Sequence, residues 1–222
     1  MRHLIVTSLV VSFFSASVAW ASGAAMTVFP STQGSSWHYR YSTGGSYSVT
    51  VTSASPNHFT EKQHGSVHAK LRFQRSAKGW VSGDVGHTQT MNTNGHKIVV
   101  KILHASGVVV PRTALWKPGF TWSFTNTDLT KMADHQYMVT ANTQLVSNST
   151  ITGMKTVKVP AGSFHCYRVR TIEHVITKVK VGKVSRMQRA KIKITEYYAK
   201  GVGLVERKAY HTTTELTHYQ IK

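Results

Sequence analysis

Apolar and polar residues alternate one by one along most of the chain beyond residue 36, and this period of two is typical of β-strands. Every second residue is aromatic across residues 37–41, and every second residue is apolar across residues 47–51. A Gly-rich turn separates these two segments, as expected for a hairpin. Convincing apolar stripes of helical period are absent. The pattern predicts an all-β, or nearly all-β, chain, in which any helix would be a turn or two around residues 128–133.

Further strands are predicted by the same alternation, and turn residues mark where they end. The predicted segments are residues 58–63, 67–74, 80–86, 87–91, 97–104, 136–145 and 155–159. The sequence Asn-Thr-Asn-Gly at residues 92–95 is a strong hairpin signal, because Asn-Gly tolerates positive φ at low cost. In the last third of the chain the pattern predicts three long antiparallel strands, at residues 164–180, 184–199 and 204–219, with turns at 181–183 and 200–203.

The N-terminus has the features of a secretory signal peptide. Arg2 supplies a positive charge, a short apolar run follows to Phe14, and Ala19-Trp20-Ala21 forms a small-x-small cleavage site. The apolar run is shorter than the ~20 residues that span a bilayer, which disfavours the alternative of an uncleaved anchor. We therefore predict a signal peptide at 1–21, a flexible lead-in at 22–35 and a single β domain at 36–222. The mature protein would be secreted, extracellular or periplasmic, and not membrane-spanning; its oligomeric state stays open.

The chain is strongly basic, with 27 Lys and Arg against 8 Asp and Glu and a formal net charge of +19. Loss of the leader removes Arg2 and no carboxylate, which leaves +18. One interpretation is binding to polyanions through a positive field. The other is life in an acidic environment, because acid unfolding mostly follows protonation of carboxylates that the native state needs ionised, and this chain has few. Since the basic residues are spread along strands, acid adaptation is slightly favoured.

One predicted hairpin is especially rich in basic residues and is the candidate for polyanion contact. Such a ribbon could follow a phosphate backbone, but no aromatic residues are interleaved for base stacking. Specific nucleic-acid recognition is therefore not predicted, whereas contact with an anionic cell-wall polymer stays open beside a solvated, edge-protecting face. The candidate residues are Lys178, Lys180, Lys183, Arg186, Arg189, Lys191 and Lys193.

Catalytic chemistry has little support in the sequence. The eight carboxylates form no close pair that suggests acid–base work, and no Gly-x-Ser-x-Gly elbow occurs. The histidines and the single cysteine, Cys166, lack the paired spacing of a zinc site. Cys166 is predicted to be a small buried hydrophobe, with intermolecular pairing or a reactive thiol as the alternatives. We predict no catalytic residue, metal or cofactor. If residues 181–183 form a three-residue loop, Arg168 lies opposite Glu196 as a buried ion-pair candidate, with a raised-pKa acid as the alternative for Glu196.

The aromatic residues are candidates for the hydrophobic core or for a ligand-binding surface. They are predicted to line the interior, and in a curved sheet the same side chains can line a groove for an acyl chain or a peptide. The ligand-binding candidates are Trp37, Tyr39, Tyr41, Trp80, Trp122, Phe124 and Tyr198.

Three motifs occur in an order that resembles a group of uncharacterised bacterial secreted domains. They are Pro-Gly-Phe-Thr-Trp at 118–122, Val-Lys-Val-Pro-Ala-Gly-Ser-Phe at 157–164, and Tyr-Tyr-Ala-Lys-Gly-Val-Gly-Leu at 197–204. The resemblance, over roughly residues 36–220, is to TapB-like domains of unknown function, similar to the lipoprotein carriers LolA and LolB. It implies a strongly curved antiparallel sheet, a half-barrel, with an apolar concave side. In the carriers helices cover that side and acyl chains bind beneath them; this chain lacks convincing helices for such a lid.

The function predicted is that of a non-enzymatic, exported envelope or extracellular binding protein that captures a hydrophobic ligand, such as a lipid, or another envelope component on the concave face. The alternative is a structural cell-surface protein retained on anionic polymers by its charge. The least favoured of the alternative functions is that of a hydrolase.

Overall fold

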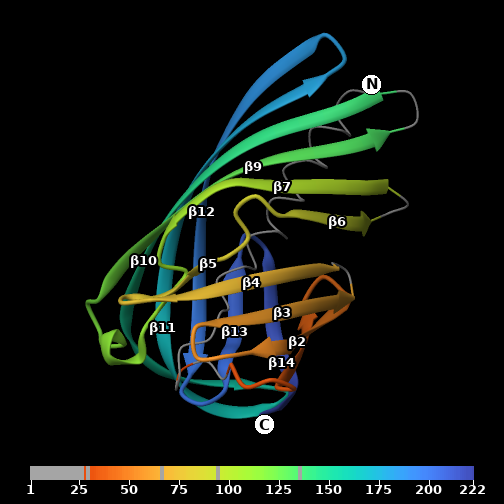
Figure 1. Cartoon of the computed structure of the whole chain (residues 1–222). Coiled ribbons are helices and arrows are strands. Elements are labelled where there is room, and N and C mark those ends of the chain that lie inside the picture. Colours follow the sequence, from red (N-terminus) through yellow and green to blue (C-terminus); the bar gives the residue numbers. More distant parts are fainter. Residues whose placement is uncertain (1–27, 29–30, 66–67, 94–95, 135–136) are drawn as a thin grey trace.

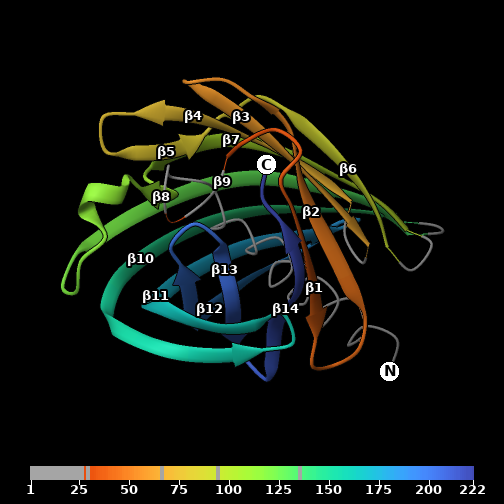
Figure 2. The same ribbon diagram turned by 90° about the horizontal axis from the view of Figure 1, so that it is seen from below.

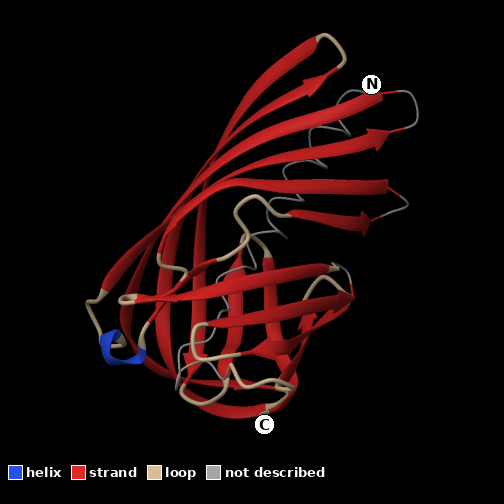
Figure 3. Ribbon diagram, viewed as in Figure 1, coloured by secondary structure: helices blue, strands red, loops and turns tan. Residues whose placement is uncertain are grey.

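The computed structural model describes residue 28 and residues 31–65, 68–93, 96–134 and 137–222. Strands make up 76% of the structure, and the helical content of the described residues is one short 3-10 turn, η2 (Thr113–Leu115) (Figure 3). The strands are β1 (Ser36–Tyr41), β2 (Ser46–Ala54), β3 (His58–Gly65), β4 (Ala69–Ser76), β5 (Gly79–Ser82), β6 (Thr88–Thr93), β7 (His96–Gly107), β8 (Val110–Pro111), β9 (Thr121–Asp134), β10 (Tyr137–Val159), β11 (Gly162–Val181), β12 (Val184–Ala199), β13 (Gly203–Ala209) and β14 (Thr212–Gln220).

All fourteen strands belong to one antiparallel sheet in the order β6-β7-β9-β10-β11-β12-β13-β14-β1-β2-β3-β4-β5-β8. The sheet curves strongly on itself but does not close, because its edge strands β6 and β8 are not paired with each other (Figures 1 and 2). The sequence-based prediction of an all-β half-barrel is therefore confirmed. Within the described residues, no helix is both long enough and apolar enough to cross a bilayer.

The faces of the sheet follow the alternation of the sequence. Along β11, residues 169, 171, 173, 175, 177 and 179 are buried, and the residues between them are exposed. A strand places successive side chains on opposite faces, so along β11 the concave inner face holds the buried set and the outer face meets solvent. At the end of β12 and in β13 both faces are covered, because residues 196–199 and 203–207 are all buried. The largest core cluster draws on β1–β5, β8 and β10–β14 and includes fully buried side chains such as Trp37, Phe59, Ile151 and Leu216.

Several predicted boundaries were wrong. Residues 128–133 are part of strand β9 and form no helix, and the two segments predicted at 136–145 and 155–159 are one continuous strand, β10. The segment predicted as one strand over 204–219 is divided into β13 and β14 by a tight turn at Tyr210, whose φ is 52°. The predicted turn at 92–95 is flanked by strands that pair as expected, although residues 94–95 lie outside the described residues.

The hairpin between β11 and β12 determines which side chains face each other across the sheet. Val181 pairs with Val184, so the loop has two residues and not three. Its first residue, Gly182, has φ 57°, the positive value that a type II′ turn needs at this position. This register shifts every pair by one residue relative to a three-residue loop. Arg168 therefore pairs with Tyr197, and Glu196 pairs with Val169.

The predicted Arg168–Glu196 ion pair is therefore wrong, because a shift of one residue turns one of the two side chains to the opposite face of the sheet. The guanidinium of Arg168 instead donates to Thr152 Oγ1 at 2.8 Å on the neighbouring strand β10. Glu196 has a different cationic partner, Arg207 of β13, which lies directly opposite it.

Candidate functional site: the inner face of the half-barrel

The aromatic candidates converge on the inner face. Four of the seven are buried in the largest core cluster, and the other three are half-buried and pack against it. The buried ones are Trp37, Tyr39, Trp80 and Tyr198, and the half-buried ones are Tyr41, Trp122 and Phe124. The structure thus brings together all seven residues, although they come from four strands, β1, β5, β9 and β12.

Ring contacts join two of these residues, Trp122 and Tyr198, through the ring of Trp116. Trp116, which follows η2, lies 5.3 Å from Tyr198, 6.2 Å from Trp122 and 5.4 Å from Tyr167, measured between ring centroids. Such separations lie in the range of favourable edge-on and tilted aromatic pairs. The indole of Trp116 also donates to the carbonyl of Pro111 at 3.0 Å, which holds the ring in place.

A group of ionisable side chains lies on the same inner face, and we call it the inner cluster. Two stacked phenol pairs form its aromatic part: the Tyr47 ring lies 4.9 Å from that of Tyr39 and 5.3 Å from that of Tyr41. The inner cluster consists of Tyr39, Tyr41, Tyr47, Glu61, Glu173, Glu196, Tyr198 and Arg207, from strands β1, β2, β3, β11, β12 and β13.

Glu61 is the member of the inner cluster whose hydrogen-bonding capacity is least satisfied. Its side chain is fully buried, and neither carboxylate oxygen has a hydrogen-bond partner. Burial raises the pKa of Glu61 well above its usual value, since desolvation penalises the charged form. A buried, unpartnered acid costs roughly 1–3 kcal/mol of stability even when neutral. In native proteins such a group calls for a specific explanation.

Glu196 and Glu173 share one cation. The nearest atoms of Arg207 and Glu196 are 3.3 Å apart, and both side chains are buried. Tyr198 donates its hydroxyl to Glu196 at 3.1 Å. Burial nevertheless raises the pKa of Glu196, and it raises the pKa of Glu173 to about 8 although Arg207 opposes the shift. Three carboxyl groups with one guanidinium cannot all be ionised cheaply in this environment.

The inner face is not uniformly apolar, contrary to what the resemblance implied. Along β9–β12 buried hydroxyls line it; Ser149 and Thr171 are bonded at 2.8 Å, and Thr143 and Thr177 at 3.3 Å. Asp128 is buried beside them and accepts from Thr130 at 3.2 Å, and burial raises its pKa to about 7. The inner face therefore has an aromatic zone and a polar zone, which suits a molecule that is itself partly apolar and partly polar.

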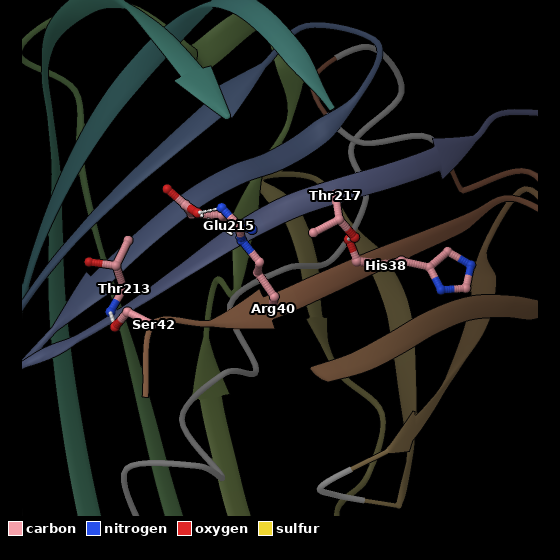
Figure 4. A network of polar contacts seen from close by, with 6 residues as sticks. All are labelled: His38, Arg40, Ser42, Thr213, Glu215 and Thr217. Atoms are coloured by element: carbon pink, nitrogen blue, oxygen red, sulfur yellow. Dashed lines mark hydrogen bonds and ion pairs between the residues drawn. The ribbon is translucent and has the colours of Figure 1, made fainter. Parts of the chain in front are cut away.

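The carboxyl groups are concentrated inside the protein. Of the seven carboxylates whose side chains are described, only Glu215 is not buried; the buried ones are Glu61, Asp84, Asp128, Glu173, Glu196 and Glu206. Glu215 forms an ion pair with Arg40 at 2.9 Å on the outer face, next to hydrogen bonds that join β1 to β14 (Figure 4). The described outer surface is therefore cationic with almost no free acid.

The basic candidates of the β11–β12 hairpin are exposed, but they do not all share one face. Lys178, Lys180, Arg189, Lys191 and Lys193 lie on the outer face, since their partners across the hairpin include the exposed Ile172 and Ile176. Arg186 pairs with the buried Val179 and so lies on the opposite face, while Lys183 is in the loop.

Metal and thiol chemistry find no support in the described part of the chain. It contains no group of three or more His, Cys, Asp or Glu side chains placed to hold a metal ion. Cys166 is buried in the core, as predicted, and burial raises the pKa of its thiol to about 12. A thiol of this kind is inert, because the thiolate is the reactive form.

The sequence reasoning did not single out Glu61, Arg207 or Tyr47 as site residues. Glu61 alternates with Phe59 and Gln63, so its position on the buried face was readable from the period of two. Nothing in the sequence indicated the role of Arg207, because that role depends on how β12 and β13 pair across a turn.

Comparisons with solved structures found distant similarities only. A Bacteroides fragilis protein, described as exported and of YmcC-like fold, has 12% identity and a TM-score of 0.47, with 89% of this chain and 100% of that chain covered. A Parabacteroides distasonis protein described as a lipoprotein has 15% identity, a TM-score of 0.41 and the same coverage. The hypothetical lipoprotein YmcC of Escherichia coli has 13% identity and a TM-score of 0.40, with 85% and 88% covered.

No curated protein shows significant similarity to the chain. A relationship to the LolA and LolB carriers is not confirmed by these comparisons. Residues 119–221, which run from just before β9 to the end of β14, match the family model described as DUF3108-like, so that this part of the chain is similar to that family.

Proposed function

We propose that the protein is a non-enzymatic, exported binding protein of the envelope or the extracellular space. It captures an amphipathic envelope component, such as a lipid, on the inner face of the half-barrel. The aromatic zone takes the apolar part of the ligand, and the inner cluster takes its polar part. Ligand sites generally combine apolar walls with a few convergent polar groups, and this is the composition of the inner face.

Glu61 is the observation that carries this proposal. A fully buried carboxyl group without a partner for either oxygen destabilises the protein by itself. A polar ligand group that hydrogen-bonds to Glu61 removes that cost, which makes the site favourable for the ligand and unfavourable when empty. The phenols of Tyr39 and Tyr47 lie close enough to influence it electrostatically, and they extend the polar surface toward Arg207.

The test compares inner-face and outer-face variants of the protein purified from its own host. The double variant Trp122→Ala/Phe124→Ala shortens two half-buried rings of the aromatic zone. The matched control, Val146→Ala/Ile172→Ala, removes exposed apolar groups that are 41% and 39% accessible. Lipid extracted from each protein is quantified by mass spectrometry, after circular dichroism and thermal unfolding have verified the fold.

We expect the inner-face variant to retain at most about a tenth of the lipid bound by the unmodified protein, because losing two aromatic contacts of about 1 kcal/mol or more each lowers affinity at least tenfold. The outer-face variant should retain nearly all of it. Equal loss in both variants, or loss only in the outer-face variant, rejects the inner face as the binding surface.

Retention on anionic polymers by charge is the second candidate, and it is favoured by the cationic outer face of the β11–β12 hairpin. Exposed charges are screened within about 10 Å at 0.1 M salt. Retention of this kind predicts that moderate salt releases the protein from cells, whereas a protein held through its inner face stays attached.

A further inference from the structure

A cavity lined by none of the residues of the inner cluster lies where the open sheet comes nearest to closing. We call it the seam pocket. It has a volume of about 260 Å³ and lies between β3, β4 and the edge strand β6. Its lining comprises Lys62, Gln63, His68, Ala69, Lys70, Arg72, Thr88, Gln89 and Thr90. This volume is below the roughly 300–1,000 Å³ of pockets for drug-sized ligands, so it fits a small molecule or a head group and not a whole lipid.

The seam exists because β4 is only partly covered. Strand β5 pairs with residues 73–76 of β4, and the first half of β4 has no strand on that side. There the backbone N–H of Gly83 donates to the carbonyl of Arg72, and the backbone N–H of Arg72 donates to the carboxylate of Asp84. The side-chain amide of Gln89 on β6 donates to the carbonyl of Lys70 at 2.9 Å. In an antiparallel strand the N–H and C=O of one residue point to the same side, so the N–H of Lys70 also faces the seam.

The lining is cationic. Lys62 and Lys70 are directly paired across β3 and β4, both are exposed, and neither has an ion-pair partner among the described residues. Arg72 is paired with Asp84 at 3.0 Å, which largely cancels both of those charges. The residues around the pocket therefore include two lysines without an ion-pair partner and the hydroxyl-bearing Thr88 and Thr90, a composition that favours an anion.

Gln89 narrows the class of anion. Its side chain is 6% exposed, and the amide oxygen is buried with no hydrogen-bond partner while the amide nitrogen is already bonded to Lys70. An unpartnered acceptor in a lining that also contains two lysines suits a ligand that carries negative charge and a hydroxyl donor. We propose that the seam pocket binds a hydroxyl-bearing phosphate ester of the phosphoglycerol type, supplied either as a soluble ester or as a lipid head group.

The test titrates the purified protein with glycerol 3-phosphate and with inorganic phosphate by calorimetry in 0.15 M salt. Lys62→Gln/Lys70→Gln removes the two ammonium groups of the pocket. Lys178→Gln/Lys191→Gln removes the same charge from the outer face of the β11–β12 hairpin and is the matched control. All four lysines are exposed, so both variants should fold.

We expect saturable binding of glycerol 3-phosphate that is tighter than binding of inorganic phosphate. The pocket variant should bind at least tenfold more weakly, and the control should stay within about twofold of the unmodified protein. A tenfold change is about 1.4 kcal/mol, less than one charge-assisted hydrogen bond can contribute. Equal weakening in both variants, absence of saturation, or equal affinity for the two ligands contradicts the proposal.

Vesicles distinguish the two sources of the ester. Binding to vesicles of phosphatidylglycerol mixed with phosphatidylcholine, lost in the pocket variant and competed by glycerol 3-phosphate, assigns the lipid head group. Pocket-dependent binding of the soluble ester without pocket-dependent binding to vesicles assigns a soluble source. The proposed function on the inner face is independent of this result, since the lipid extraction described above does not involve Lys62 or Lys70.

Discussion

The purified protein is expected to be more stable at pH 5 than at pH 8 by several kcal/mol, the opposite of a protein held together by ionised carboxylates. Five buried carboxyl groups have raised pKa values, and in each case burial is the largest cause; they are Glu61, Asp84, Asp128, Glu173 and Glu196. A folded-state pKa above the unfolded value means that the folded protein binds protons more tightly. The stability from these groups is complete below about pH 4 and is lost as the pH rises through their folded pKa values.

The size of the effect follows from the two groups with defined values. The pKa is about 7 for Asp128 and about 8 for Glu173, against ordinary values of 3.8 and 4.5. Between pH 5 and pH 8 each loses on the order of 2–3 kcal/mol. Greater repulsion among the cations in acid offsets part of this gain. For a protein of this size the net change corresponds to a melting temperature about 10 °C higher at pH 5.

Thermal unfolding followed by circular dichroism across pH 4.5–8.5, in 0.15 M salt, measures this dependence. The variant Glu173→Gln removes one of the titrating groups and should flatten the profile between pH 5 and pH 8. A melting temperature that stays constant or rises with pH in this range would show that the buried acids are ionised or well paired. The same measurement tests the idea of acid adaptation, which the composition alone suggested.

Replacing Glu61 with methionine is expected to stabilise the ligand-free protein at pH 8 by roughly 1–3 kcal/mol. Methionine has a similar unbranched shape, and it removes a fully buried acid whose two oxygens have no partner. Most core substitutions destabilise, so a gain at this position would mark a residue retained for a purpose other than stability. Urea denaturation of the delipidated protein gives the free energy of unfolding directly.

Glu215→Gln provides the control, since it removes a carboxyl group from an exposed ion pair with Arg40. It should cost at most about 1 kcal/mol. Alongside its gain in stability, Glu61→Met should lower the amount of copurified lipid. If Glu61→Met destabilises the protein by more than about 1 kcal/mol, the carboxyl group has a partner in the folded state and the main argument for a ligand fails.

The fold could be predicted from the sequence because alternation is a local property. The period of two identified the strands and the all-β class, and it placed Trp37, Tyr39 and Tyr198 on the buried side. It failed where the turn had no distinctive residues. The turn at Tyr210 and His211 contains no Gly, Pro or Asn, so two strands were read as one. Turn residues, more than strand residues, determined which boundaries were recognised.

The candidate site was harder to predict because it depends on pairing across strands. A loop of two residues at Gly182 and Lys183 moved Arg168 to the face opposite that of Glu196. The true partner, Arg207, comes from the next strand, and its pairing with Glu196 could not be obtained without the register of β12 and β13. The polar zone around Asp128 was missed for a related reason, since residues 128–133 were the one place where a helix was considered.

Quenching of tryptophan fluorescence by dibromostearate, with stearate as the unbrominated control, tests capture of an apolar chain on the inner face most directly. Apart from Trp20 in the predicted leader, the chain has four tryptophans, and all of them belong to or pack against the inner core cluster; they are Trp37, Trp80, Trp116 and Trp122. Bromine quenches indole only at short range, so the signal reports where the chain binds. We predict saturable quenching of more than about half of the emission, unchanged in Lys178→Gln/Lys191→Gln. Quenching no greater than with stearate, or quenching that disappears in that outer-face variant, would contradict the account.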